Sequence, residues 1–179
     1  MDFNIIHITG ASGAGTTTLG RAISETFGHT HLDSDDFFWE PTTPRFLVKR
    51  EKETRAQLLL EAIEKSGGRC VISGSLTGWG DIFIPEFELV VYVKTPTALR
   101  LERLSARELA EFGDSILPGG EREQEFKEFL DWAAKYDTGG LDIRSAALHA
   151  EWLQQLTCPV VGVNGALPVT ENLMILSRL

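Results

Sequence analysis

Short runs of β-branched residues alternate along this chain with stretches of helical periodicity. Parallel strands need long crossover connections, which are usually helices, so the alternation is typical of a parallel sheet covered by helices. We expect strands at about residues 4–9, 30–32, 70–73, 89–94 and 159–163. They predict an α/β fold with a doubly wound, five-stranded parallel sheet in three layers, with helices on both faces.

Helical segments are expected between and after these strands. They are predicted at residues 16–27, 49–65, 97–112, 121–135 and 141–156, with a further helix closing the chain. The stretch DSDDFFWEPTTPRF follows the second strand, and we predict it to be a loop because Pro41 and Pro44 cannot continue a helix. Loops beside rigid strands often carry binding and catalytic residues.

The composition restricts the classes of protein and partner. A length of 179 residues fits one domain, and a hydrophobic fraction of 42% is ordinary for a globular protein. The formal charge of −9 argues against a general surface for nucleic acid or anionic membranes. The apolar run at the N-terminus is short and lacks a basic leader, so we expect a cytoplasmic protein. Cys70 and Cys158 are expected to be free thiols.

The sequence GASGAGTTT lies between the first expected strand and the first expected helix. Gly10 and Gly15 have the spacing of the phosphate-binding pattern G-x-x-x-x-G-K-[ST], and Thr17 fills its hydroxyl position. Thr16 stands where that pattern has lysine. The residues expected to hold nucleotide phosphates are Gly10, Ser12, Gly13, Ala14, Gly15, Thr16, Thr17 and Thr18.

Two other interpretations of the glycine loop compete with phosphate binding. The dinucleotide fingerprint G-x-G-x-x-G fits less well, because Ser12 or Thr18 occupies a position that requires glycine. A glycine turn that only joins a strand to a helix stays open as an alternative.

The missing lysine has a chemical consequence. Main-chain N–H groups at a helix N-terminus can bind phosphate alone, but losing one donor to developing charge costs about 2.7 to 4 kcal/mol. We therefore expect a replacement cation. Arg100, Arg103 and Arg107 are spaced to lie on one helical face, and Arg122 and Arg144 are weaker candidates. A solvated row paired with the interleaved glutamates is the alternative.

Three carboxylates, Asp33, Asp35 and Asp36, follow the second expected strand. Such an oxygen-rich setting suits Mg²⁺. Capping of a helix or turn by aspartate is the alternative explanation.

The segments GASGAGTT, HLDSDDF and VVYVKTPTALRLERLSAR resemble the nucleoside monophosphate kinase and shikimate kinase group of P-loop kinases, over roughly the first 110 residues. The run of three threonines is similar to the loop of archaeal-type cytidylate kinases. The resemblance implies one kinase-like domain over residues 1–179, with an acceptor-binding insertion at about 35–66 and a lid at about 103–125.

The resemblance also implies roles for single residues. Thr17 and Asp33 would hold Mg²⁺, and the catalytic residues would be Asp35, Arg103 and Arg107. The acceptor would be bound by Asp35, Arg45, Arg50, Gly74 and Ser75. The expected reaction is ATP-dependent phosphoryl transfer to a nucleoside monophosphate or a small hydroxyl metabolite, with no nucleic-acid or membrane partner and with the oligomeric state open. A nucleotide-binding sensor without turnover and an NTP hydrolase are the competing hypotheses.

Overall fold

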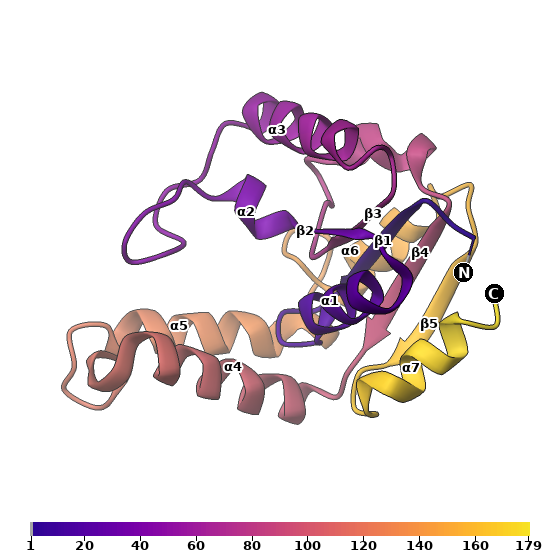
Figure 1. The fold of residues 1–179 in the computed structure, drawn as a ribbon. Coiled ribbons are helices and arrows are strands. Elements are labelled where there is room, and N and C mark those ends of the chain that lie inside the picture. Colours follow the sequence, from indigo (N-terminus) through magenta and orange to yellow (C-terminus); the bar gives the residue numbers. More distant parts are fainter. Residues whose placement is uncertain (1) are drawn as a thin grey trace.

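The computed structural model describes residues 2–179, and within them five strands form one sheet with every neighbouring pair parallel (Figure 1). The strand order is β2-β3-β1-β4-β5. The strands are β1 (Ile5–Gly10), β2 (Thr30–Asp33), β3 (Cys70–Ser73), β4 (Leu89–Lys94) and β5 (Val160–Asn164). This arrangement confirms the fold class that the sequence predicted.

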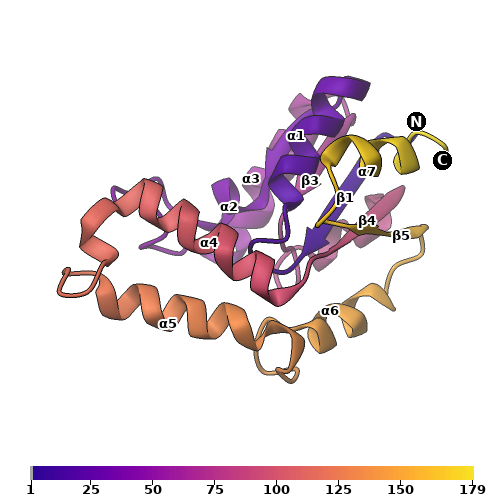
Figure 2. The ribbon, with the colours of Figure 1, turned by 90° about the horizontal axis from the view of Figure 1, so that it is seen from below.

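Helices connect the strands and cover both faces of the sheet, as Figures 1 and 2 show together. The α-helices are α1 (Thr16–Phe27), α2 (Ser34–Phe38), α3 (Lys52–Lys65), α4 (Thr97–Phe112), α5 (Glu123–Ala134), α6 (Ala146–Leu153) and α7 (Val169–Leu176). Three short 3₁₀ helices are η1 (Asp81–Glu86), η2 (Gly113–Ile116) and η3 (Lys135–Asp137). Among residues 2–179, no helix has both the length and the apolar character needed to span a bilayer.

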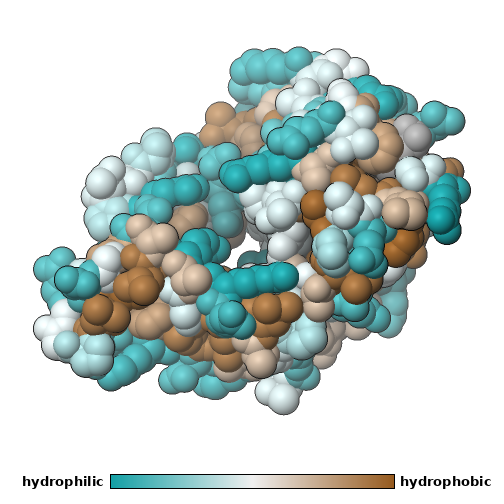
Figure 3. Space-filling model, turned by 60° about the horizontal axis from the view of Figure 1, so that its bottom comes forward, coloured by the Kyte–Doolittle hydropathy of each residue, from teal (hydrophilic) through white to brown (hydrophobic). Residues whose placement is uncertain are grey.

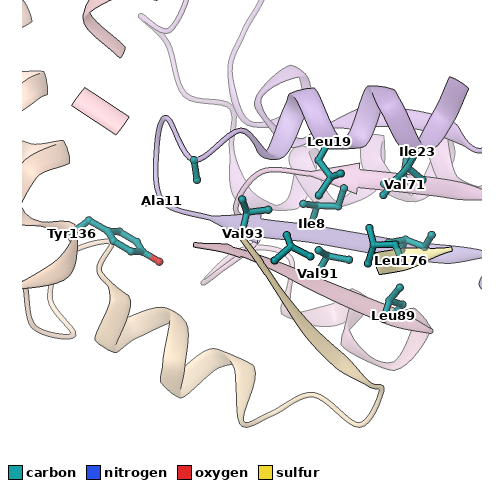
Figure 4. Close-up of a cluster of buried hydrophobic side chains, with 13 residues drawn as sticks. Ile8, Ala11, Leu19, Ile23, Val71, Leu89, Val91, Val93, Tyr136 and Leu176 are labelled. Atoms are coloured by element: carbon teal, nitrogen blue, oxygen red, sulfur yellow. The ribbon is translucent and has the colours of Figure 1, made fainter. Parts of the chain in front are cut away.

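Each face of the sheet has its own hydrophobic core because successive strand residues point to opposite sides. In β1, Ile6 and Ile8 pack with Leu19 and Ile23 of α1 and with Leu176 of α7 (Figure 4). The other face packs against α3, η1 and α6, whose contributing residues include Leu59, Ile63, Phe83 and Trp152. Both cores hold the strands in a fixed register, so the strand ends have fixed positions.

The prediction of a loop directly after the second strand is wrong for residues 34–38, which form α2. Asp33 caps this helix, because its carboxylate accepts a hydrogen bond from the Asp35 N–H at 3.1 Å. The chain then forms the predicted loop, which is closed by an antiparallel bridge between Trp39 and Lys49. That bridge delays the start of α3 to Lys52.

The predicted helix over residues 141–156 is also shorter in the structure. It begins at Ala146 because Ser145 is its N-cap, with the Ser145 hydroxyl accepting the Leu148 N–H at 3.0 Å. The residues before Ser145 therefore form a connection between η3 and α6.

Helices α4 and α5 form an antiparallel hairpin that projects from the sheet (Figures 1 and 2). Arg100, only 1% exposed, fixes the base of this hairpin. Its guanidinium donates to the carbonyls of Thr95 at 3.1 Å and Ala133 at 3.2 Å, and to the Asp137 carboxylate at 2.8 Å. The predicted lid at about residues 103–125 lies in the outer part of the hairpin, and its role as a lid stays a prediction.

Because Arg100 joins both helices of the hairpin, Arg100→Ala should lower the free energy of unfolding by about 3 kcal/mol. Arg107→Ala is the matched control, since Arg107 lies on the same helix with a side chain that is 53% exposed. A solvent-exposed ion pair contributes about 0 to 1 kcal/mol. Urea denaturation of both variants checks this difference, and equal small losses would contradict it.

Stability should also fall between pH 6.5 and about 4 because of His7. Burial lowers the pKa of His7 from 6.5 to about 4, while its Nδ1–H donates to the Ile72 carbonyl at 3.1 Å. In this range the unfolded chain binds a proton that the folded chain does not, so acidification favours unfolding. Denaturation curves at several pH values should show a shallower pH dependence for His7→Gln, and an unchanged slope would contradict this cause.

Candidate active site

A cleft of about 1620 Å³ opens at the carboxyl ends of β1, β2 and β3. Figure 3 shows the hollow on one face of the molecule. Parallel register places these strand ends together, because Ser73 at the end of β3 is paired with both Ile8 of β1 and Asp33 of β2. The segment from Ser12 to Thr18 lines the cleft.

The glycine loop leaves β1 at Gly10 and enters α1 at Thr16. Gly13 and Gly15 have φ values of 77° and 98°, a region in which side chains other than glycine's are strained. A Cβ on Gly13 would also lie 2.6 Å from the Arg100 carbonyl. The hydroxyl of Thr95, just beyond β4, donates to the Ala14 carbonyl at 2.9 Å. The loop is therefore held by the start of the hairpin, with its following helix pointing its N-terminus into the cleft.

Thr17 and Asp33 meet at the floor of the cleft, where the Thr17 hydroxyl donates to the Asp33 carboxylate at 2.9 Å. The other Asp33 oxygen accepts from the Asp35 N–H at 3.1 Å. Asp33 therefore caps α2, as the alternative explanation expected, and also faces the loop hydroxyl; its Mg²⁺ role stays a prediction.

These oxygens fit Mg²⁺, which prefers hard oxygen ligands and keeps several waters. Within residues 2–179, no group of three His, Cys, Asp or Glu side chains gathers to hold a metal alone. A cation bound by Thr17 and Asp33 would therefore need phosphate and water oxygens to complete its coordination.

Asp35 lines the cleft as the second residue of α2, two residues after Asp33. The surrounding protein desolvates its carboxyl group and raises the pKa, and the neighbouring Asp33 charge raises it further. The positive charges of Arg144, Arg107 and Arg45 oppose this shift. A carboxylate with a raised pKa is a better proton acceptor, so Asp35 is suited to receive a proton from a hydroxyl group.

The expected row of arginines divides in the structure. Arg100 is buried in the hairpin base and does not line the cleft. Arg103 lines it and donates to the Gly165 carbonyl at 2.9 Å, beside the glycine loop. Arg107 also lines it, but forms an ion pair with Glu108 at 2.7 Å. Arg122 lines it and pairs with Glu125 at 2.9 Å.

The residues expected to bind the acceptor lie in different places. Arg45 lines the cleft, with its guanidinium 3.7 Å from the Asp36 carboxylate. Arg50 instead lines a separate hollow of about 510 Å³ and pairs with Glu40 at 3.1 Å. Its Nε–H also donates to the Trp39 carbonyl at 3.0 Å, so Arg50 fastens the loop after α2.

Gly74 and Ser75 follow β3 and line the cleft, and their binding of an acceptor stays a prediction. Gly74 has a φ of 111°, and a Cβ there would lie 1.9 Å from the Ser34 hydroxyl. Gly74 lies so close to Ser34 that a residue with a side chain would not fit at position 74. The contact joins the chain segments that follow β2 and β3. The Ser75 hydroxyl lies 3.5 Å from Nε2 of the buried His149, and His149 Nδ1 lies 2.7 Å from the Tyr136 hydroxyl.

Sequence reasoning missed an aromatic wall on α5. Phe126, Phe129 and Trp132 line the cleft, across from Phe38 and Trp39 near α2. Their spacing of three residues was a usable signal, because it places them along one helical face. The contact between His149 and Tyr136 had no such signal, since it depends on how η3 and α6 pack.

Comparisons with known proteins agree with this geometry. Residues 6–126 match the AAA domain family AAA_18. The chain is 42% identical over 167 residues to the uncharacterized protein YqaC of Bacillus subtilis, covering 93% of this chain and 92% of that protein. It is 26% identical over 157 residues to the cytidylate kinase of Pyrococcus horikoshii, covering 81% and 76% of the two chains.

A solved structure supports the fold alone. The shikimate kinase of Bacteroides thetaiotaomicron has a TM-score of 0.59 at 20% identity, covering 99% of each chain. Since the family match extends over about two thirds of the residues, this chain belongs to the AAA_18 family of AAA domains.

Proposed function

We propose that this protein is an enzyme that transfers the terminal phosphoryl group of ATP to a small acceptor, either a nucleoside monophosphate or a small hydroxyl metabolite. The observation that carries the proposal is the Thr17–Asp33 hydrogen bond of 2.9 Å beside the glycine loop. It puts a hydroxyl and a carboxylate where a nucleotide held by the loop would present its phosphates. The kinase names of the curated relatives support the same reaction class.

Each group of cleft residues has a proposed role that follows from its position. N–H groups of Gly13 to Thr17 would bind the phosphates at the N-terminus of α1. Mg²⁺, held by Thr17 and Asp33, would neutralise phosphate charge that otherwise repels an incoming nucleophile. Arg103 and Arg107 would stabilise the transferred group from the hairpin. Arg45, Gly74 and Ser75 would bind the acceptor, whereas the ion pair of Arg50 gives that residue a supporting role.

In the transfer, an acceptor oxygen forms a bond to the terminal phosphorus of ATP. The bond from that phosphorus to the bridging oxygen breaks, and ADP leaves with the electron pair. A hydroxyl acceptor must also lose its proton, and the Asp35 carboxylate is placed to accept it. A phosphate acceptor attacks with an oxygen that is already ionised, so Asp35 would then only orient it.

The proposed reaction predicts ADP formation that depends on an acceptor. ATP consumption should be measured with Mg²⁺ and a panel of nucleoside monophosphates and small polyols, with each acceptor omitted in turn as the control. Turnover without any acceptor would favour an NTP hydrolase. ATP binding without turnover for the whole panel would favour a nucleotide sensor.

Asp33→Asn should reduce Mg²⁺-dependent turnover by about 10²-fold or more, because an amide carries no charge for the cation. Asparagine is also a good N-cap, so α2 should persist and thermal stability should change little. The measurement is the Mg²⁺ dependence of kcat. An unchanged Mg²⁺ response would remove Asp33 from the proposed metal site.

A further inference from the structure

Arg144 is a cleft cation without a counter-ion in contact. Its Nη2 donates to the Gly10 carbonyl at 3.0 Å, and its Nε is buried without any hydrogen-bond partner. No carboxylate of residues 2–179 lies within 4.0 Å of its guanidinium, whereas Arg45, Arg107 and Arg122 each have one. A guanidinium has five N–H donors, so this group has unused hydrogen-bonding capacity.

The local fold holds Arg144 in place. It directly precedes Ser145, which is fully buried, caps α6 and donates from its hydroxyl to the Gly140 carbonyl at 2.6 Å. Burial lowers the pKa of the Arg144 guanidinium, and the Asp35 charge opposes this shift. A charge kept in such surroundings is stabilised when an anion comes into contact with it.

Arg144 contacts the same loop from which the lysine is missing. Its hydrogen-bond partner Gly10 is the first glycine of the loop, and Thr16 stands in the lysine position. A Cβ built on Gly10 would lie 3.5 Å from the Thr16 Cγ2. Arg144 and the residue at position 16 are therefore both close to Gly10 at the start of the loop.

Arg144 and Asp35 line the same cleft, together with the residues of the glycine loop. One cleft therefore brings together Arg144, the loop that would hold ATP and the carboxylate that would face the acceptor. Arg103 lies elsewhere on the loop, where both of its Nη groups point to main-chain carbonyls, those of Ala14 and Gly165.

We propose that Arg144 is the cation that replaces the missing loop lysine, with its guanidinium contacting the phosphoryl group in transit from nucleotide to acceptor. This inference rests on the proposed function. Arg144 forms and breaks no covalent bond and keeps its proton throughout. It stabilises charge on the equatorial oxygens of the transferred group, which is the task of a preorganised cation in phosphoryl transfer.

The test uses second-site restoration in the full-length protein. Arg144→Gln should lower kcat by about 10² to 10³-fold. Adding Thr16→Lys to that variant supplies an ammonium at the same end of the loop, and should restore kcat by about tenfold or more. A double variant no faster than Arg144→Gln would overturn the proposal. So would an Arg144→Gln enzyme with a kcat close to that of the parent.

A binding measurement separates this inference from the proposed function. Affinities for a nonhydrolysable ATP analogue and for ADP should be measured by calorimetry. Arg144→Gln should weaken binding of the analogue by about tenfold and leave binding of ADP nearly unchanged, and Thr16→Lys should restore the affinity for the analogue. This arm applies even if the parent protein turns over no acceptor. If Arg144→Gln weakened the binding of both nucleotides equally and also lowered the Tm, Arg144 would have a purely structural role and the proposal would be overturned.

Two variants serve as controls. Arg144→Lys keeps a positive charge and should retain the preference for the analogue over ADP, and losing that preference to the extent seen in Arg144→Gln would overturn the proposal. Arg21→Gln removes another cleft arginine without an acidic partner, and this one is exposed on α1. The Arg21→Gln variant should prefer the analogue over ADP as strongly as the parent does. A loss of this preference as large as in Arg144→Gln would show that any positive charge in the cleft has the same effect, and would overturn the proposal.

Discussion

Parallel pairing of β1, β2 and β3 is the constraint on which the site depends. The pairing of Ser73 with both Ile8 and Asp33 brings three strand ends to one edge of the sheet. The glycine loop, the capped helix α2 and the Gly74 turn each begin there. Their side chains converge although they are far apart in sequence, because the two hydrophobic cores fix the strands from both faces.

Much of this arrangement was predictable from local sequence. The β-branched runs gave all five strands to within one or two residues, and the spacing of Gly10, Gly15 and Thr17 indicated the loop before helix α1. Asp33 was also identifiable, because a carboxylate at the end of a parallel strand points toward the same edge as the loop. These features depend on period and spacing, which a sequence displays directly.

The remaining features depend on packing between distant elements. Arg100 and Arg103 belong to one helical row, yet one is enclosed by Thr95, Ala133 and Asp137 while the other faces the cleft. Nothing in the spacing distinguishes them. Residues of the segment before α6, above all Arg144, could be placed only once η3 and α6 were packed against the sheet. The short helix α2 was missed because two prolines dominated the interpretation of its neighbourhood.

The Arg100 guanidinium at the root of the α4–α5 hairpin has a mechanical consequence. It ties the two helices to each other and to the chain just beyond β4, so the pair would move together as one arm. With 16 residues in α4, the arm is ~24 Å long at ~1.5 Å per residue. A rotation of about 10° at the root would sweep the far end through ~4 Å, enough to bring aromatic side chains of α5 onto a molecule in the cleft without disturbing the strands.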